Sequence, residues 1–385
     1  MTAYRPQPAA CDIRRRWLAL SLLTAMKPGH WQTVLDQLSC PTDLLDLPGS
    51  ALKALGLPPS ARRTITEQWQ AGQDNGRFHQ RLSQAEVCLQ EGAASMLSWQ
   101  DPDYPQFLRH IHGPPPVLYV RGNPQTLKQP QIGIVGSRHA SRDGLDHARG
   151  FARALAQAGC VITSGLALGA DAAAHRGALE VAGASIGVLA TGVDRLYPRQ
   201  HADLAMAMLD GGALVSEMPP GTPPTPDLFP RRNRILSGLC QGVLVVEASP
   251  RSGSLITARL ALEQGREVFA IPGSINNPQA RGCHQLIREG AVLVETVDDV
   301  LQELGVWDTV AKHSEVTAAS ESSATDHLDE REQRVMAALS YEPRSTDDLC
   351  DHAGLTADQL LQSLLLLEME SLVESSPAGY RKRAS

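Results

Sequence analysis

A chain of 385 residues with 42% hydrophobic content has room for two or three ordinary globular domains. Its formal net charge of −7 argues against a protein that coats nucleic acid over its whole surface, although a local basic groove stays compatible with it. The seven cysteines are widely spaced without any Cys-x-x-Cys pair, a pattern typical of a reducing cytosol and of chains without disulfide frameworks or zinc sites.

Residues 1–98 are expected to form an all-helical module. The basic and apolar residues 14–26 resemble a secretory signal, but no small-x-small cleavage site follows them, and no segment reaches the ~20 apolar residues of a membrane span. We therefore expect a soluble, cytoplasmic protein. Residues 44–58 have the leucine–Pro-Gly–leucine form of a helical hairpin that can place a helix N-terminus on a DNA phosphate. Because only Lys53 is basic nearby, a plain turn between packed helices is favoured.

Residues 99–305 are expected to form an α/β core. A proline-dense bridge, 101–122, ends in a strand at 117–120, and its two histidines, His110 and His112, lack the further ligands that a metal site needs. Helices then alternate with further apolar runs, which predict strands at 132–135, 160–163, 185–190, 213–217, 242–247, 267–271 and 291–295. This alternation predicts a parallel sheet, and ligands of such sheets bind beyond the carboxyl ends of the strands.

The last part of the chain is expected to be a linker, 306–325, and a winged-helix-like module, 326–385. The module has helical patterns at 331–339, 346–352 and 356–370, followed by a small hairpin. Six basic and twelve acidic residues give it a net charge of −6, and its third helix contains no Lys or Arg. Reading of duplex DNA by that helix is therefore disfavoured, and a protein contact is predicted instead.

Three glycine turns follow strands of the core. Gly136-Ser137-Arg138 combines backbone N–H groups at a helix start with an arginine that can bind phosphate. Ser164-Gly165 begins the second turn, which runs to Asp171, and Ser252-Gly253-Ser254 begins the third, which runs to Thr257. Three such turns at one sheet edge indicate an anion-binding surface more specifically than one does.

An arginine-rich helix start adds a fourth part. Phe229 precedes Arg231, Arg232, Asn233 and Arg234, and cations at a helix N-terminus oppose the helix dipole. Phosphate binding explains such a cluster, although a solvated helix start is the simpler alternative. Phe229 is positioned to stack on a base, and Tyr197 is a second, weaker candidate.

Several nucleotide and enzyme sites are missing. No Gly-x-Gly-x-x-Gly follows the first strand of the core, no Walker motif occurs, and residues 131–305 contain no lysine. Asp171 and His175 lie one helical turn apart, but an Asp at a helix start is more often a cap than a general base. No nucleophile–base–orienter set is apparent. We therefore expect no cofactor, no metal and no catalytic residue.

In combination, the motifs GSR, SGLALGAD, TGVDRLYP, FPRRNRILSG, SGSLITA, GREVFAIPG and GCHQLIREGA resemble the DNA-processing protein A (DprA/Smf) family. The resemblance is dense over residues 100–305. It implies an extended Rossmann-like core, homodimers, binding of single-stranded DNA, protection of incoming strands, and loading of a RecA-type recombinase in natural transformation or homologous recombination. It also implies that the strand-binding pocket comprises residues 136–138, Ser164, Gly165, Phe229, residues 231–234 and the turn 252–257.

The alternative is an enzyme on the same sheet, a nucleotide-hydrolysing relative such as the lysine-decarboxylase-like phosphoribohydrolases. Those enzymes carry a Pro-Gly-Gly-x-Gly-Thr turn closely followed by a glutamate. The corresponding place here reads Arg251-Ser252-Gly253-Ser254, and the next acid is the distant Glu263. Release of free base from nucleoside monophosphates would favour this alternative.

Overall fold

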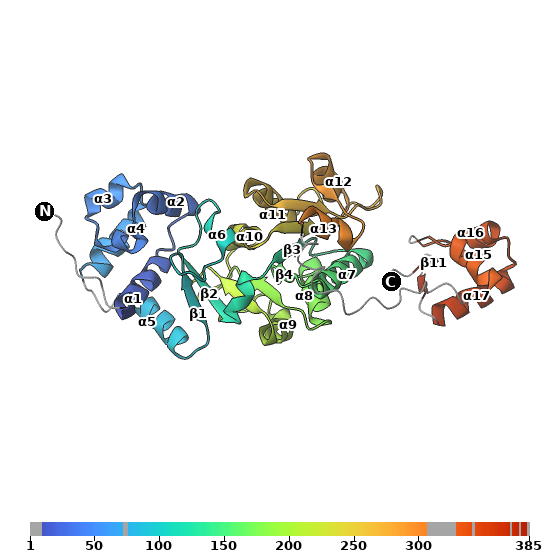
Figure 1. Ribbon diagram of the computed structural model, residues 1–385, viewed down its shortest axis with the longest axis horizontal. Helices are drawn as coiled ribbons and strands as arrows, with labels where there is room; N and C mark the ends of the chain where they lie inside the picture. Colours follow the sequence, from blue (N-terminus) through green and yellow to red (C-terminus); the bar gives the residue numbers. More distant parts are fainter. Residues whose placement is uncertain are drawn as a thin grey trace. The chain divides into compact units, whose positions relative to one another are not determined.

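Nine strands form one sheet in the computed structural model, which describes residues 10–71, 76–305, 329–340, 343–369, 372–376 and 379–382 (Figure 1). The strands are β1 (Ser95–Ser98), β2 (Val117–Gly122), β3 (Gln131–Val135), β4 (Val161–Ser164), β5 (Ser185–Val188), β6 (Ala213–Ser216), β7 (Gly242–Val245), β8 (Glu267–Ala270) and β9 (Val292–Leu293). Their order across the sheet is β1-β2-β6-β5-β4-β3-β7-β8-β9.

The predicted α/β fold with a parallel sheet is confirmed for β3 to β9, whose neighbouring strands all pair in parallel. At one edge, β2 pairs antiparallel with β6, and β1 pairs antiparallel with β2. β1 was not predicted, because its four residues, SMLS, contain no apolar run and are mostly half-buried. The parallel strands bring all their carboxyl ends to the same edge of the sheet.

Helices cover both faces of the sheet. One hydrophobic cluster packs α7 (Arg142–Gln157), α8 (Ala170–Leu179) and α13 (Val297–Glu303) against one face. A second packs α10 (Leu228–Leu239), α11 (Gly253–Glu263) and α12 (Arg281–Arg288) against the other. Residues of β7 alternate between the two, with Leu244 in the first and Val243 and Val245 in the second. Its run of buried residues is therefore continuous, as the sequence indicated.

The helical N-terminal module packs on the antiparallel edge of the sheet. Its elements are α1 (Ala10–Ser21), α2 (Pro28–Gln37), η1 (Pro41–Asp46), α3 (Gly49–Ala54), α4 (Pro59–Arg63), η2 (Thr64–Trp69) and α5 (Arg77–Gln90). Their apolar side chains form one cluster with Val117 and Tyr119 of β2. The Ser21 and Tyr119 hydroxyls are hydrogen-bonded at 2.7 Å. Short helical segments also occur between the strands of the sheet. Two flank β2, namely α6 (Gln106–Arg109) and η3 (Pro124–Lys128), and three lie between β5 and β6, namely η4 (Arg199–His201), α9 (Ala202–Ala207) and η5 (Met208–Asp210).

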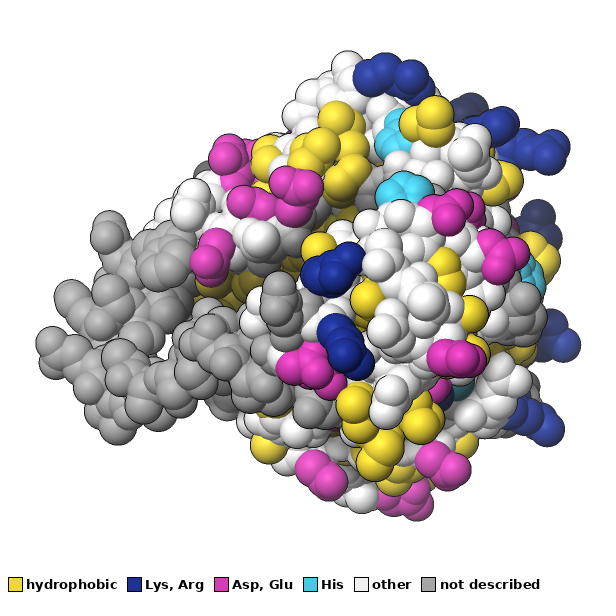
Figure 2. All heavy atoms as spheres, turned by 90° about the vertical axis from the view of Figure 1, so that its right-hand side faces the viewer, with side chains coloured by type: hydrophobic (Ala, Val, Ile, Leu, Met, Phe, Trp, Pro, Cys, Tyr) yellow, Lys and Arg dark blue, Asp and Glu magenta, His cyan; other side chains and the backbone are white. Residues whose placement is uncertain are grey.

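The C-terminal module has the predicted three helices and hairpin, which are α15 (Glu330–Ala338), α16 (Thr346–Ala353), α17 (Ala357–Met369), β10 (Val373–Ser376) and β11 (Gly379–Lys382). The helices enclose a small core of their own. Figure 2 shows one face of the chain, on which hydrophobic, acidic and basic side chains all reach the surface.

Contacts divide the chain into two compact units, residues 1–312 and 313–385. This division does not test the boundary predicted at residue 98, which stays a prediction. The predicted linker, 306–325, lies outside the described residues. Within the described ranges, no helix is both long enough and apolar enough to span a membrane.

Two glycines on adjoining helices generate a stability prediction. A Cβ at Gly177 of α8 would lie 2.2 Å from the Arg149 carbonyl oxygen of α7, whereas a Cβ at Gly150 of α7 would meet no atom within 4 Å. Gly177→Ala should therefore lower the free energy of unfolding by about 1–3 kcal/mol through overpacking. Gly150→Ala should raise it by roughly 0.5–1 kcal/mol through helix propensity. Urea unfolding of both variants measures the difference, and equal stabilities would contradict the tight packing of α7 on α8.

Candidate nucleic-acid interface

The three predicted glycine turns lie side by side, because they follow β4, β3 and β7, which are neighbours in the sheet. The connection after β5 and the segment 217–231 after β6 reach the same edge. We call these turns, at the carboxyl ends of β3 to β7, the rim. The N-terminus of α10 also lies at the rim, since this helix connects β6 to the parallel strand β7.

The rim carries an exposed cluster of one arginine and two aromatic rings, formed by Arg138, Tyr197 and Phe229. The Arg138 guanidinium carbon lies 5.8 Å from the centroid of the Phe229 ring. The Tyr197 ring centroid lies 5.6 Å from that of Phe229, with the planes inclined at 58°. Arg138 is exposed, Tyr197 is 47% exposed, and Phe229 between them is half-buried. The fold therefore assembles, from three separate segments, the cation and the aromatics that the sequence indicated individually. We call this group the stacking cluster.

Glu217, directly after β6, holds two of the arginines of α10. Arg231 donates from Nε and Nη2 to the two carboxylate oxygens, at 2.8 and 3.2 Å. Arg234 donates to the same carboxylate from Nη2 and to the Gly113 carbonyl oxygen from Nη1, the latter at 2.9 Å. Burial lowers the pKa of Arg234, and the Glu217 charge opposes that shift. The Arg234 guanidinium thus lies inside the protein, and only Arg231 borders solvent, with 21% of its side chain exposed.

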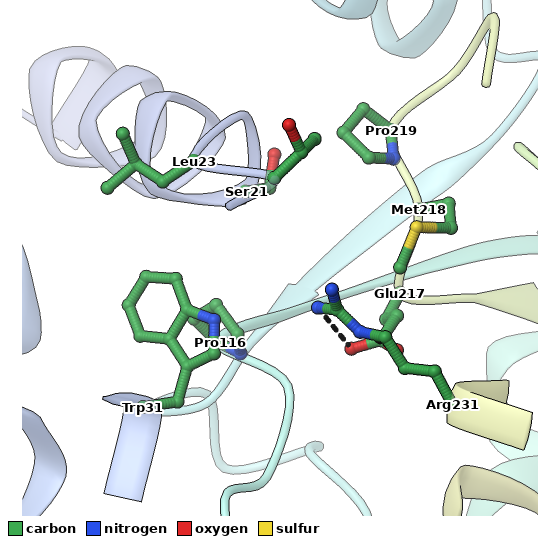
Figure 3. Close-up of a pocket in the computed structure, with 9 residues that line it drawn as sticks. Ser21, Leu23, Trp31, Pro116, Glu217, Met218, Pro219 and Arg231 are labelled. Carbon is green, nitrogen blue, oxygen red and sulfur yellow. Dashed lines mark hydrogen bonds and ion pairs between the residues drawn. The ribbon is translucent and has the colours of Figure 1, made fainter. Parts of the chain in front are cut away.

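Arg231 and Glu217 also line a small pocket between the rim and the N-terminal module (Figure 3). Trp31 of α2 and Pro116, just before β2, lie across from the ion pair. Because Arg234 also binds Gly113, whose N–H donates to Gln32 of α2 at 2.7 Å, the same ion pairs tie α10 to the helical module.

Arg232 points inward as well. Its Nη1 donates to the Val188 carbonyl oxygen at the end of β5. Its guanidinium fills the space beside Gly165, where a Cβ would lie 2.1 Å from Nη1. Burial lowers the pKa of Arg232, while the charge of Asp171 raises it. Gly165 is therefore required by the arginine that packs against it, rather than by the approach of a ligand.

An internal carboxylate already occupies the backbone donors of the second turn. Asp171 accepts hydrogen bonds from the N–H groups of Gly165 and Ala167, at 3.1 and 3.2 Å. Burial raises the pKa of Asp171, and Arg232 and these backbone donors oppose the shift. His175, bonded through Nδ1 to the Ser185 hydroxyl at 2.7 Å, is buried, and its burial lowers its pKa to about 3. Asp171 therefore shapes the turn and does not form an acid–base couple with His175.

A second internal carboxylate, Glu247, occupies the N-terminus of α7. It accepts from the Ser141 N–H at 2.8 Å, the Ser141 hydroxyl at 2.7 Å and the Asn277 amide at 3.0 Å. A Cβ at Gly144 would lie 2.6 Å from it. In nucleotide-binding folds a phosphate takes this position. Glu217, Glu247 and Asn277 were not identified as site residues from the sequence. For the two glutamates, the available signal was an acid at the carboxyl end of a predicted strand, and Asn277 had no such signal.

The first turn has unpaired backbone donors, and the third turn is exposed at Gly253. The N–H groups of Ser137 and Arg138 have no hydrogen-bond partner within the described part of the chain. Gly253 is exposed, and a Cβ there would meet no atom within 4 Å. The Ser252 hydroxyl accepts from the Ser254 N–H at 3.3 Å, while Ser254 and Thr257 are buried. Three predicted site residues remain. Gly136 is half-buried and packs against Ala170, and Asn233 is half-buried on α10. Ser164 is buried, and its hydroxyl donates to the Ile134 carbonyl oxygen.

Comparison with known proteins identifies relatives over most of the chain. A family model described as DNA recombination-mediator protein A matches residues 95–305, and one described as DprA winged helix domain matches residues 318–379. Protein Smf of Escherichia coli K12 is 43% identical over 281 residues, which cover 72% of this chain and 74% of that protein. DNA processing protein DprA of Bacillus subtilis is 41% identical over 229 residues, 59% of this chain and 77% of that protein.

Two solved structures share the fold. DNA processing protein A from Streptococcus pneumoniae has a TM-score of 0.62 at 35% identity and covers 74% of this chain and 97% of its own. The structure from Helicobacter pylori, which concerns the single-stranded DNA binding mode of that protein, has a TM-score of 0.50 at 28% identity and covers 55% and 95%. The matched core, the matched winged-helix domain and these relatives agree, and the chain belongs to the DNA recombination-mediator protein A family, also named DprA or Smf.

Proposed function

We propose that this protein binds single-stranded DNA along the rim, protects incoming strands, and loads a RecA-type recombinase during natural transformation or homologous recombination. It does so as a cytoplasmic homodimer and without chemistry on the DNA. The stacking cluster carries the proposal, because an exposed arginine between open backbone donors and two aromatic rings offers contacts for both phosphate and base. The H. pylori relative, whose structure concerns single-stranded DNA binding, adds support.

A single strand fits this surface better than a duplex. Its bases are free to stack on Phe229 and Tyr197, whereas paired bases keep their faces inside the helix. Stacking of a base on an aromatic side chain contributes about 1–3 kcal/mol and depends little on the identity of the base. Arg138 and the N–H groups beside it then bind the backbone, which every sequence shares. The expected result is binding that prefers single strands and tolerates any sequence.

Burial separates the predicted site residues into two groups. We assign direct contact with DNA to the exposed or half-buried residues Gly136, Arg138, Phe229, Arg231, Ser252 and Gly253, together with Tyr197. Ser137 has a buried side chain, and we assign the contact there to its unpaired backbone N–H group. We assign a supporting role to the buried residues Ser164, Gly165, Arg232, Arg234, Ser254 and Thr257. We assign the same role to Asn233, which is half-buried and whose carbonyl oxygen accepts from the Ser237 hydroxyl. The second group holds the rim in shape through the contacts to Val188, Gly113 and Glu217.

Two of the three buried carboxylates of the rim, those of Asp171 and Glu247, support a role without catalysis. Asp171 and Glu247 accept hydrogen bonds from backbone and side-chain donors of their own chain. Each is thereby committed to holding a turn, rather than aimed at a substrate proton or an attacking water. No observation at the rim favours the phosphoribohydrolase alternative.

The proposed function is tested with an oligonucleotide as single strand and as duplex. We expect tighter binding of the single strand in a gel shift, and faster assembly of a RecA-type recombinase on that strand when the protein is present. The duplex serves as the matched control for length and sequence. Equal affinity for both forms would refute the preference for single strands, and unchanged recombinase assembly would refute the loading role.

Arg138→Ala should weaken single-strand binding by a similar factor for all sequences. Because one phosphate contact is lost, the plot of log affinity against log salt concentration should flatten by about 0.7, the value for one phosphate on a single strand. Fluorescence anisotropy titrations at several salt concentrations measure the slope. Arg153→Ala is the control, because this exposed residue lies on α7 about 16 Å beyond its N-terminus. A slope equal to that of the original protein would exclude Arg138 from the backbone contact.

Phe229→Ala should weaken binding through loss of stacking, by roughly 1–3 kcal/mol, while the salt slope stays unchanged because no charge is removed. Phe229→Trp should retain the affinity. A strand with abasic positions separates stacking from other effects, since Phe229→Ala should bind it as well as the original protein does. An equal loss on the abasic strand would show that Phe229 only positions its neighbours.

A further inference from the structure

Helix α17 of the C-terminal module is hydrophobic on both faces. Leu360, Leu364 and Leu367 are buried in the core of the module. The opposite face carries four large apolar side chains, which are Leu361, Leu365, Leu366 and Met369, and these are 47%, 59%, 45% and 77% exposed. Positions 361, 365 and 369 are four residues apart and so form one stripe along the helix, with Leu366 beside it. We call these four residues the outer stripe.

The described residues of the module leave the outer stripe uncovered, because their core lies on the other side of α17. Isolated exposed leucines are ordinary, but a contiguous apolar surface marks an interaction site. The outer stripe is therefore a surface that requires a partner.

DNA does not fit this surface. The third helix of a winged helix normally presents its outer face to the major groove. Here α17 contains no Lys or Arg, and Asp358 and Glu368 lie exposed near the two ends of the stripe. Three arginines elsewhere in the module have internal partners. Arg334 donates to the Ala353 and Gly354 carbonyls, Arg344 donates to the Ala338 carbonyl, and Arg381 pairs with Glu374. A phosphate backbone would meet negative charge and hydrocarbon.

A second copy of the module fits poorly as well. If two α17 helices packed antiparallel along their stripes, Asp358 of one would face Glu368 of the other, and parallel packing would bring identical charges together. Both arrangements place like charges at the edge of the contact, where they oppose association. Complementarity requires apolar side chains at the centre of the partner and cations at its ends.

We propose that the outer stripe binds an amphipathic helix of another protein, with apolar residues at helical spacing and Lys or Arg beside them. In this mode of recognition the apolar face of a helix packs into a hydrophobic surface, and flanking charges set specificity. Asp358 and Glu368 pair with the cations of the partner. The site is separate from the rim, so the inference stands whether or not the rim binds single strands.

Binding of defined peptides to the full chain tests the proposal. The probe is a fluorescent peptide of leucine and lysine whose leucines form one helical stripe, and the matched control has the same composition in an order without a stripe. We expect the striped peptide to bind about tenfold more tightly or better, because burying even one leucine contributes a factor of this size. A third peptide with glutamate in place of lysine should bind more weakly than the first. Equal binding of striped and scrambled peptides, or no binding of either, would overturn the proposal.

Variants of the full chain locate the site. Leu365→Gln should reduce binding of the striped peptide about tenfold, because it removes an apolar contact at the centre of the stripe. Leu262→Gln is the control, since this leucine is 45% exposed on α11 and lies outside the module. Asp358→Asn with Glu368→Gln should weaken binding and reduce its salt dependence. An undiminished affinity of Leu365→Gln would overturn the proposal.

The Leu365→Gln variant also tests whether the outer stripe binds a second copy of the chain or DNA instead. Sedimentation of the full chain should be unchanged by the substitution, and loss of an assembled state would assign the stripe to a second copy. Affinity for single-stranded DNA should also be unchanged, and a large loss would assign the stripe to DNA. Either loss would refute a basic protein helix as the partner.

Discussion

The buried carboxylate of Glu217 determines how the rim is built. It lies directly after β6 and binds two guanidinium groups of α10, and one of these also holds Gly113 of the segment that leads into β2. Removing one partner of such a pair typically costs about 3–5 kcal/mol, because it leaves a charge buried without compensation. The ion pairs thereby fix the start of α10, and with it the position of Phe229 beside Arg138. The exposed chemistry of the rim depends on this buried electrostatic contact.

Internal carboxylates also explain why a sheet of nucleotide-binding type need not hold a nucleotide. Glu247 occupies the N-terminus of α7, and Asp171 occupies the backbone donors of the turn after β4. Two places where related topologies seat a phosphate are thus filled by the protein itself. The unpaired donors of the first turn lie beside the exposed Arg138, and Gly253 is exposed at the same edge, where an extended chain can pass. A surface of this kind suits a polymer better than a small, enclosed ligand.

Much of this architecture follows from local sequence patterns, and the rest depends on long-range contacts. Hydrophobic periodicity predicts β3 to β9 and the helices between them, whereas β1 has too short a pattern to be recognised. The cations at the start of α10 led to a prediction of phosphate binding, and the sequence does not show that Arg231 and Arg234 pair with Glu217. That acid lies 14 residues before Arg231 and 17 before Arg234, so only the fold reveals which arginines face inward. The sequence alone identified Arg138, Tyr197 and Phe229 but not their contact.

The two units of the chain show how a fold can be retained while its partner changes. A winged helix exposes the outer face of its third helix whatever residues occupy it, so side chains alone decide what binds there. Cations on that face favour a phosphate backbone, while the leucines, Asp358 and Glu368 of α17 favour a hydrophobic, cationic surface. In the core, by contrast, an arginine and aromatic rings lie on the exposed edge of the sheet. We propose that this opposite surface chemistry lets one unit contact nucleic acid while the other contacts protein.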